Sequence, residues 1–170
     1  MALSEKVIFC PQCGMRLIMK ECRGRSRQAC PACGWTYFPD PKVAAAVVVL
    51  KDEHLLLVRR ANNPGRGLWT LPAGFVDAGE DPASAAEREC LEETSLQVRI
   101  TGVFEIISGR EHPRGADILI VYFASAIEGE LRAHDDVDEA AFFSLRDLPP
   151  LAFEATKRIV TRLKLNHLHP

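Results

Sequence analysis

The chain has few aromatic residues, little net charge and no long hydrophobic run. Aromatics make up 7% of its 170 residues, and a formal net charge of −2 gives no strong attraction to nucleic acid or to a membrane surface. The longest apolar run, Val43–Leu50, is far too short to cross a bilayer, and it predicts a strand that is buried on both faces. No secretory signal is visible, because Glu5 and Lys6 interrupt the start and no apolar segment follows. We therefore expect a cytoplasmic protein with no membrane partner.

The length and composition fit one medium-sized domain with a small module beside it. Hydrophobic residues make up 47% of the chain and charged residues 26%, which is ordinary for a globular protein. The charge is uneven, since residues 1–40 have six Lys and Arg against three Asp and Glu, whereas residues 41–170 have fifteen against twenty. The excess of basic residues in residues 1–40 indicates either an anionic ligand near this segment or a solvated surface, and composition leaves both possibilities open.

Six cysteines are present, and four of them form two Cys-x-x-Cys-Gly motifs, "CPQCG" and "CPACG", with sixteen residues between the pairs. Disulfides are disfavoured in a reducing cytoplasm, and two matched copies disfavour a redox motif. Four thiolates around a tetrahedral centre are typical of structural zinc, which would also stabilise a module with little core. Residues 1–39 are therefore predicted to form a zinc ribbon, with Lys20–Gln28 as a hairpin tip, Gly24 in its turn and Cys22 outside the metal site. The predicted zinc ligands are Cys10, Cys13, Cys30 and Cys33.

Residues 40–170 predict an α+β domain with a mixed sheet and two helices. The first helix has Asp81 as its N-cap and Pro82 at its first position, and it ends at Thr94–Ser95. The second helix covers Phe153–Leu165, and the apolar residues that face the sheet are Ile159, Val160 and Leu163. Strands are expected at Val43–Leu50 and Leu55–Arg60, which form a hairpin, and at Leu68–Ala73, Leu96–Ser108, Ala116–Ile127 and Ala140–Leu145.

Three glutamates of the first helix, Glu89, Glu92 and Glu93, lie at positions i, i+3 and i+4 and therefore share one face. Each like-charge pair costs roughly a few tenths of a kcal/mol unless something neutralises it. A solvated face would carry interleaved basic residues, but only Arg88 is close, and its position predicts that it points away from the three acids. Carboxylates are ligands that Mg²⁺ and Mn²⁺ prefer, so the cluster predicts a dication site, with a solvated face as the alternative.

The segment Gly74–Leu96 resembles the Nudix box, which reads Gly, five residues, Glu, seven residues, Arg-Glu, an aliphatic residue, any residue, Glu-Glu, any residue, Gly and an aliphatic residue. Every charged position matches, whereas Cys90 replaces the first aliphatic residue and Ser95 replaces the second Gly. Cys90 is a small hydrophobe, but Ser95 weakens a turn in which Gly adopts a left-handed conformation freely. The resemblance covers about residues 41–165 and implies an α/β/α sandwich with a mixed sheet. The matching residues are Gly74, Glu80, Arg88, Glu89, Glu92, Glu93 and Leu96.

Nudix hydrolases cleave the diphosphate linkage of a nucleoside diphosphate joined to another group. The resemblance implies that Glu89, Glu92 and Glu93 coordinate catalytic Mg²⁺ or Mn²⁺, with Glu80 as a structural or metal-linked acid. Arg88 would orient a neighbouring carboxylate through a charge-assisted hydrogen bond. The metal would offset charge on the diphosphate and lower the pKa of a water, whose proton a carboxylate then accepts.

The general base is left open between Glu89 and a later acidic loop, His134–Glu139, for which an acidic surface turn is the alternative. The candidates in that loop are Asp135, Asp136 and Glu139, and the spacing to Phe142 favours Asp136. The predicted substrate-binding residues are Arg59, Arg60, Arg66 and Gly74. The loop Ser108–Asp117 adds candidates for substrate choice, namely Arg110, Glu111, His112 and Arg114.

A zinc ribbon ahead of a Nudix domain resembles two groups of enzymes. The NADH and NAD-cap diphosphatases carry a Ser-Gln-Pro-Trp-Pro-Phe-Pro-type stretch after the box, and "GVFEIISGREHPRG" lacks it. A shorter type is linked to hydrolysis of FAD and ADP-ribose, and "RGLWTLPAGFVDAGE" looks like that type. We expect FAD as the first substrate and ADP-ribose as the second, each releasing AMP, and a homodimer is left open. The alternatives are an NADH or NAD-cap diphosphatase, and a nucleotide-sensing module whose ribbon contacts RNA or protein.

Overall fold

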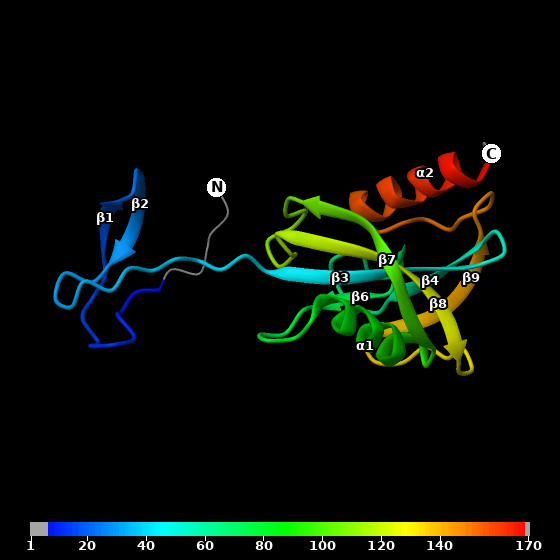
Figure 1. Cartoon of the computed structure of the whole chain (residues 1–170), viewed down its shortest axis with the longest axis horizontal. Helices are drawn as coiled ribbons and strands as arrows, with labels where there is room; N and C mark the ends of the chain where they lie inside the picture. The colour runs from blue at the N-terminus through cyan, green and yellow to red at the C-terminus, as the bar shows by residue number, and fades with distance from the viewer. Residues whose placement is uncertain (1–6, 169–170) are drawn as a thin grey trace. The chain divides into compact units, whose positions relative to one another are not determined.

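The computed structural model describes residues 7–168 (Figure 1). The chain divides into two compact units, one that ends at Pro41 and one that begins at Lys42. None of the helices in the described residues is long and apolar enough to span a bilayer. The four candidate zinc ligands lie in the first unit, and the glutamates of the Nudix box lie in the second.

The first unit is built on an antiparallel hairpin of β1 (Ile18–Cys22) and β2 (Arg25–Ala29). The two turn residues, Arg23 and Gly24, have positive φ angles of 52° and 73°, as expected for a two-residue turn that follows the twist of its strands. This confirms the predicted hairpin with Gly24 in its turn. The core of the unit is small: among the described residues, its buried hydrophobic members are Cys10, Ala29 and Cys30.

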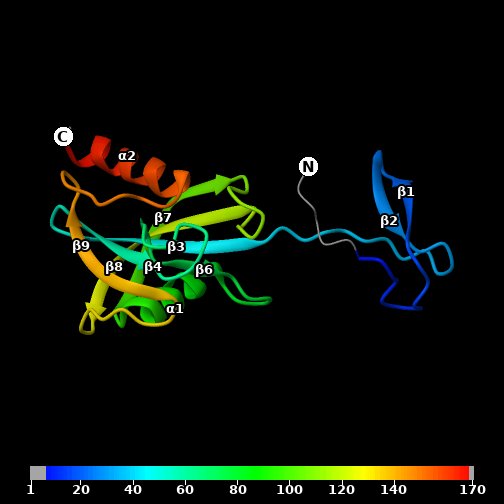
Figure 2. The same cartoon turned by 180° about the vertical axis from the view of Figure 1, so that it is seen from behind.

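The second unit contains a seven-stranded mixed sheet. Its strands are β3 (Val43–Lys51), β4 (His54–Arg60), β5 (Trp69–Thr70), β6 (Ala73–Phe75), β7 (Gln97–Ser108), β8 (Ile118–Glu128) and β9 (Val137–Ser144). The order along the main path is β5-β4-β3-β8-β7, while β6 pairs with β3 and β9 pairs with β4. Figure 2 shows β3, β4 and β9 from behind the view of Figure 1. The pair of β3 and β8 is parallel and the other pairs are antiparallel. The predicted hairpin of β3 and β4 is confirmed.

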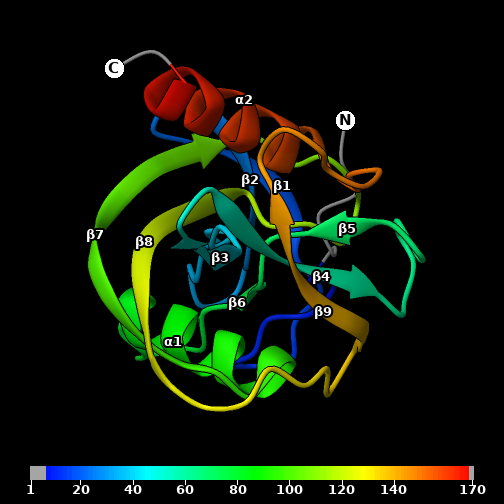
Figure 3. The ribbon, with the colours of Figure 1, turned by 90° about the vertical axis from the view of Figure 1, so that its right-hand side faces the viewer.

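Two helices cover opposite faces of this sheet (Figure 3). They are α1 (Pro82–Thr94) and α2 (Glu154–Leu168). Central strand β3 supplies both layers of core, because successive side chains of a strand point to opposite faces. Ala45, Val47 and Val49 pack in the layer of α1, whereas Ala46 and Val48 pack in the layer of α2. The predictions of a doubly buried strand and an α/β/α sandwich are therefore confirmed, and the residues expected to face the sheet from α2, namely Ile159, Val160 and Leu163, are buried.

Two parts of the sheet differ most from the sequence prediction. The single strand expected at residues 68–73 is two short strands, β5 and β6, with Leu71 and Pro72 between them. Proline has no N–H to donate to a sheet, although the Pro72 carbonyl accepts the N–H of Val47 at 3.1 Å. Strand β9 begins at Val137, three residues earlier than expected, because β4 pairs with it as far as Arg60. Half of the predicted acidic loop is thus strand.

Candidate functional site

The sequence around α1 fixes both ends of the helix that carries the glutamates. The Asp81 carboxylate accepts the N–H groups of Ala83 at 2.9 Å and Ser84 at 3.2 Å, and Pro82 is the first helical residue, as predicted. At the other end Ser95 adopts the left-handed conformation, with φ of 59°. The chain thus leaves the helix as it would with Gly at this place in the box, although a serine adopts this conformation at a cost in free energy.

Arg88 donates to Glu80, Glu89 and Glu92, so the prediction that it points away from the helix glutamates is wrong for Glu89 and Glu92. Its Nε and Nη2 donate to the two oxygens of Glu80 at 2.8 and 3.0 Å. Its Nη1 donates to Glu89 at 2.7 Å and to Glu92 at 3.0 Å, and Nη2 also donates to the Phe75 carbonyl at 3.1 Å. The long side chain folds back over the helix, where a planar group with five N–H donors reaches several acceptors together. Arg88 therefore offsets part of the repulsion that the spacing implies.

Glu93 is the buried acid of the cluster, with 5% of its surface exposed. One carboxylate oxygen accepts the N–H of Ala73 at 3.1 Å, which ties the helix to β6. Burial, followed by the nearby negative charge of Asp136, raises the pKa of Glu93 to about 9. Burial also raises the pKa of Glu89, against the opposing effect of Arg88. A dication bound among these acids would favour their charged forms, because its positive charge would offset the free-energy cost of burying a carboxylate.

Glu80 and Glu92 lie at the outer side of the cluster. Hydrogen bonds from Arg88, helped by the backbone N–H of Asp77, lower the pKa of Glu80 to about 2, so this acid is charged at neutral pH. The Glu92 side chain is 46% exposed, and its contact with Arg88 is the i,i−4 pair of the helix. Glu80 therefore acts in the structure as an anchor for Arg88. Glu92 is exposed beside Arg88 and, unlike Glu89 and Glu93, is not among the described residues that line the cavity.

Gly74 in β6 lies against Glu89. A methyl group built at Gly74 would lie 2.0 Å from the Glu89 carboxylate carbon, which is far inside van der Waals contact. The backbone of Gly74 pairs with Ala45 of β3, so it has little freedom to move away. The glycine of the box is therefore needed as a space for the carboxylate. Gly74 also lines the cavity described below, so its predicted role in binding substrate stays a prediction.

The acidic loop before β9 is fastened to the end of α1. His134 donates its backbone N–H to the Glu93 carbonyl at 3.0 Å, and Arg132 donates to the Thr94 carbonyl at 3.0 Å. These bonds satisfy carbonyl groups that the last turn of a helix leaves without partners. Asp135 and Asp136 are the next two residues, so these bonds place them close to the glutamates of α1.

The two acidic segments meet at a cavity of about 490 Å³. Its acidic side consists of Glu89, Glu93, Asp135 and Asp136. The rest of its wall includes cationic and aromatic side chains, namely Arg60, Arg88, Arg114, His112, Phe75 and Phe153. Small residues of β3, Ala44 and Ala46, leave room for it to extend over the sheet face. A cavity with carboxylates on one side and arginines near them suits a dication together with an anionic ligand.

Of the three arginines upstream of the box that were predicted to bind substrate, one lines this cavity and two do not. Arg60 lines it, donates to the Pro64 carbonyl at 2.7 Å and lies 5.0 Å from the centre of the Phe153 ring. Arg59 instead pairs with Glu139 at 3.2 Å, and Arg66 is exposed; neither belongs to the described wall of the cavity. Of the candidates for the general base, Asp135 and Asp136 line the cavity, whereas Glu139 pairs with Arg59 outside its described wall.

Some residues of the site could not have been found from local sequence. The hydroxyls of Thr70 and Thr156 lie 3.0 Å apart in the cavity wall and are buried, although 86 residues separate them. Phe153 was expected only as the start of a helix. Glu87, a fourth acid of α1, takes no part, because its carboxylate accepts the N–H of Ile100 at 2.9 Å and so fastens the helix to β7.

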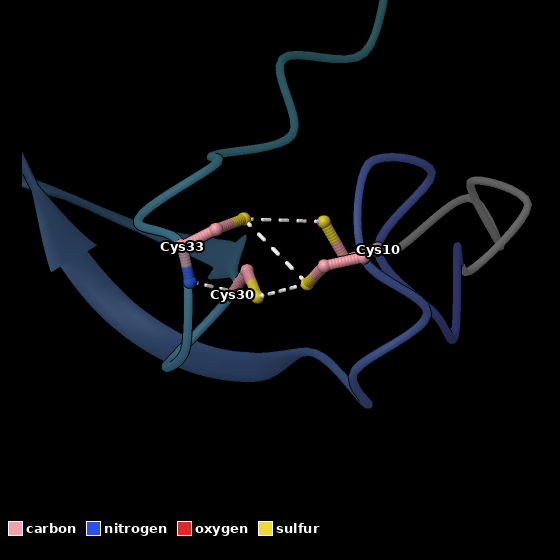
Figure 4. Close-up of side chains that lie close together, drawn as sticks. Cys10, Cys30 and Cys33 are labelled. Atoms are coloured by element: carbon pink, nitrogen blue, oxygen red, sulfur yellow. Dashed lines mark hydrogen bonds between the residues drawn. The ribbon is translucent and has the colours of Figure 1, made fainter.

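The four cysteines of the first unit converge. Their sulfur atoms all lie within 4.8 Å of one another, and Cys13 approaches Cys30 to 3.4 Å and Cys33 to 3.7 Å. Figure 4 shows Cys10, Cys30 and Cys33 directed toward one another. The backbone N–H of Cys33, 3.5 Å from the Cys30 sulfur, lowers the pKa of that thiol to about 6. Four sulfurs at this spacing suggest a zinc site, since thiolate is the form that binds the metal.

Comparison with known sequences gives one family. The model of the NUDIX domain matches residues 40–163. An ADP-ribose pyrophosphatase from Methanocaldococcus jannaschii is 43% identical over 120 residues, which are 70% of this chain and 71% of that protein. The NAD-capped RNA hydrolase NudC of Pseudomonas aeruginosa is 31% identical over 144 residues, which are 84% of this chain and 50% of the relative. The chain thus spans about half the length of that second relative.

Solved structures agree with this result. A NUDIX hydrolase from Nitrosomonas europaea superposes with a TM-score of 0.83 at 28% identity, covering 95% of this chain and 92% of the other. The NUDIX domain of NrtR from Shewanella oneidensis, crystallised with ADP ribose, gives a TM-score of 0.62 at 25% identity, with 75% and 90% covered. Nudix enzymes typically depend on a divalent metal, and the glutamate helix, the cavity and the sequence match lead to the same conclusion. The chain belongs to the Nudix family of hydrolases, as a diphosphatase that acts on nucleotides.

Proposed function

We propose that this chain hydrolyses ADP-ribose to AMP and ribose 5-phosphate, with Mg²⁺ or Mn²⁺ at the glutamates of α1. The observation that carries the proposal is the cavity in which Glu89 and Glu93 of the helix meet Asp135 and Asp136 of the later loop. The relative at 43% identity is an ADP-ribose pyrophosphatase, and this supports placing ADP-ribose ahead of FAD, the first choice from sequence. FAD, which would give AMP and FMN, is the second candidate.

The residues of the site fit a dication. Glu89, Glu92 and Glu93 would hold it through carboxylate oxygens, which Mg²⁺ and Mn²⁺ prefer, and the burial of Glu93 among other acids is the feature that favours a cation there. The bound ion would offset the charge of the diphosphate and lower the pKa of a water beside it. Glu80 would take part indirectly, because both of its oxygens accept from Arg88.

The side chains of the cavity account for the remaining chemistry. Asp136 accepts a proton from the attacking water, whose oxygen forms a bond to one phosphorus of the diphosphate. The bond between that phosphorus and the bridging oxygen breaks, and the bridging oxygen leaves with the second phosphate. Arg60, which lines the same cavity, offsets negative charge on the diphosphate, and Arg88 keeps Glu89 in position.

We propose further that the first unit is a zinc ribbon and the second the Nudix domain. The four sulfurs support a structural role for zinc, because a site with four protein ligands leaves no position open for substrate or water. The partner of the second unit is a small nucleotide substrate.

A panel of dinucleotides tests the proposal. Zinc-loaded protein is incubated with ADP-ribose, FAD and NADH, with and without Mg²⁺, and the products are separated by chromatography. We expect the main products to be AMP and ribose 5-phosphate, formed only in the presence of Mg²⁺. The Glu92→Gln variant should form neither product. Cleavage of FAD or NADH in preference to ADP-ribose would overturn the substrate, and tight binding with no turnover would indicate a sensor instead of an enzyme.

A further inference from the structure

The loop between β7 and β8, residues 109–117, is fastened to a helix that lies far along the chain. The Glu111 carboxylate accepts the backbone N–H of Glu154 at 2.9 Å through one oxygen and that of Ala155 at 2.7 Å through the other. Both N–H groups belong to the first turn of α2, where a helix has no acceptors of its own. Glu111 therefore supplies from a distance of 43 residues what a capping side chain normally supplies locally.

The contact is favoured by charge as well as by hydrogen bonding. The N-terminus of a helix has partial positive charge, and a carboxylate that accepts two backbone N–H groups there makes charge-assisted bonds. The side chain of Glu154 lies at the same helix end but pairs with Lys157 at 2.6 Å and makes no part of the cavity wall. Two acids thus lie beside one helix end, and only Glu111 joins it to the loop.

The same loop is held at further points. His112 stacks on Phe153, with ring centres 5.8 Å apart and planes 21° from parallel. At the base of the loop Arg110 donates to Asp117 at 2.7 Å, and that same Asp117 oxygen accepts the backbone N–H of Lys42 at 2.9 Å. The base is therefore fixed to the start of β3, while the tip depends on Glu111 and on the stacked rings for its place beside α2.

This loop forms a wall of the substrate cavity. Glu111, His112, Arg114 and Gly115 line the cavity from the loop side. Phe153, the residue before α2, and Ala155 within α2 also line it. The reacting end lies elsewhere in the cavity, at the glutamates of α1 and the aspartates before β9. A displacement of the loop would change the part of the cavity that receives the remainder of the nucleotide.

We propose that Glu111 is a positioning residue: by capping α2 it fixes the His112 loop as a wall of the cavity and thereby sets the affinity for the nucleotide. The inference rests on the proposed function for its kinetic test. Loss of the cap frees the loop tip and lowers the fraction of molecules in which the cavity is formed. The reacting groups stay in place, so KM changes and kcat does not.

The experiment compares Glu111→Gln with Glu154→Gln in the full zinc-loaded chain. Each variant removes one negative charge from the same helix end, but only the first disturbs the two capping bonds. We expect Glu111→Gln to raise KM for ADP-ribose about tenfold, the order that a charged hydrogen-bond pair implies, with kcat within about twofold. Amide hydrogen exchange of Glu154, Ala155 and residues 109–117 should quicken in the same variant. Glu154→Gln should leave both KM and exchange unchanged.

Three results would overturn the inference: an unchanged KM in Glu111→Gln, a fall in kcat without a change in KM, or an equal rise of KM in Glu154→Gln. Failure of the proposed function has a different signature, because the wild-type protein itself would then hydrolyse no nucleotide of the panel. The exchange measurement still decides in that case whether Glu111 holds the loop, since unchanged exchange in Glu111→Gln would contradict the capping role.

Discussion

The cysteine cluster and the glutamate helix are two candidate metal sites in one chain, and they differ in what surrounds them. The cysteines gather in a unit whose described buried hydrophobic residues are three, and two of those are cysteines themselves. The glutamates lie on a capped helix that packs on a sheet through its own apolar layer. The metal of the first site should therefore hold its unit folded, whereas the helix that carries the second site is held in place by its own packing.

The largest expected effect concerns turnover at the glutamate helix. Glu93→Gln should lower kcat for ADP-ribose by about a thousandfold, because loss of a metal ligand removes several kcal/mol of transition-state stabilisation. The melting temperature of the metal-free protein should not fall, because the substitution removes a buried acid without a cation beside it. Steady-state kinetics and calorimetry on the same preparation measure both. A variant that melts early while turning over normally would assign Glu93 to the fold and not to the reaction.

Removal of zinc should unfold the first unit. Cys30→Ser, or a zinc chelator, should abolish amide protection of the β1–β2 hairpin, because little apolar core remains to hold it. The second unit should keep its melting transition and its Mg²⁺-dependent turnover. Hydrogen exchange with mass spectrometry follows both units in one sample. A hairpin whose amides stay protected without zinc would contradict the claim that zinc holds the first unit folded.

Gly74→Ala tests whether the glutamate site depends on a close fit. The new methyl group would press on the Glu89 carboxylate, and a displacement of about 1 Å in a catalytic group costs on the order of a hundredfold in rate. Gly102→Ala in β7 is the matched control, because a methyl group there meets no atom within 4 Å. Equal kcat for the two variants would show that Glu89 moves aside without cost.

A further effect concerns the pH dependence of stability without metal. The pKa of Glu93 is about 9 in the folded protein and 4.5 in a model compound, so between these values the unfolded chain loses a proton that the folded chain keeps. Glu93 should therefore make the metal-free protein progressively less stable as pH rises from about 4.5 to about 9. Melting curves of wild type and Glu93→Gln at several pH values measure the contribution of Glu93 to this pH dependence. Mg²⁺ should stabilise the wild type more at high pH than at low pH. Parallel pH profiles for the two proteins would contradict the burial of a neutral acid.

The sequence predicted most of what depends on spacing along the chain. The convergence of the four cysteines follows from motif spacing, and the doubly buried strand at residues 43–50 follows from its apolar run. Helical periodicity explains why both Glu89 and Glu93 reach the cavity. Arg88 was misjudged, because helical position fixes where a side chain starts but not where four rotatable bonds take it. The site residues themselves, as opposed to the fold, stay predictions until metal and substrate are measured.

Contacts between segments far apart in the sequence could not be predicted from local spacing. Glu111 lies 43 residues before the helix that it caps, and Thr70 lies 86 residues before Thr156. No periodicity or motif relates these pairs, because the sheet topology alone brings their elements together. The early start of β9 has the same cause, since β4 extends the ladder beyond the point where the apolar alternation ends.

The central claim is that the acids of α1 bind a dication, and titration with Mn²⁺ tests it most directly. Free Mn²⁺ is measured by electron paramagnetic resonance in zinc-loaded protein, without substrate, for wild type, Glu89→Gln and Glu87→Gln. Glu87 is the matched control, because it lies on the same helix but accepts a hydrogen bond from Ile100. The account predicts that Glu89→Gln weakens Mn²⁺ binding at least tenfold while Glu87→Gln leaves it unchanged. Equal Mn²⁺ affinity in all three proteins would contradict it.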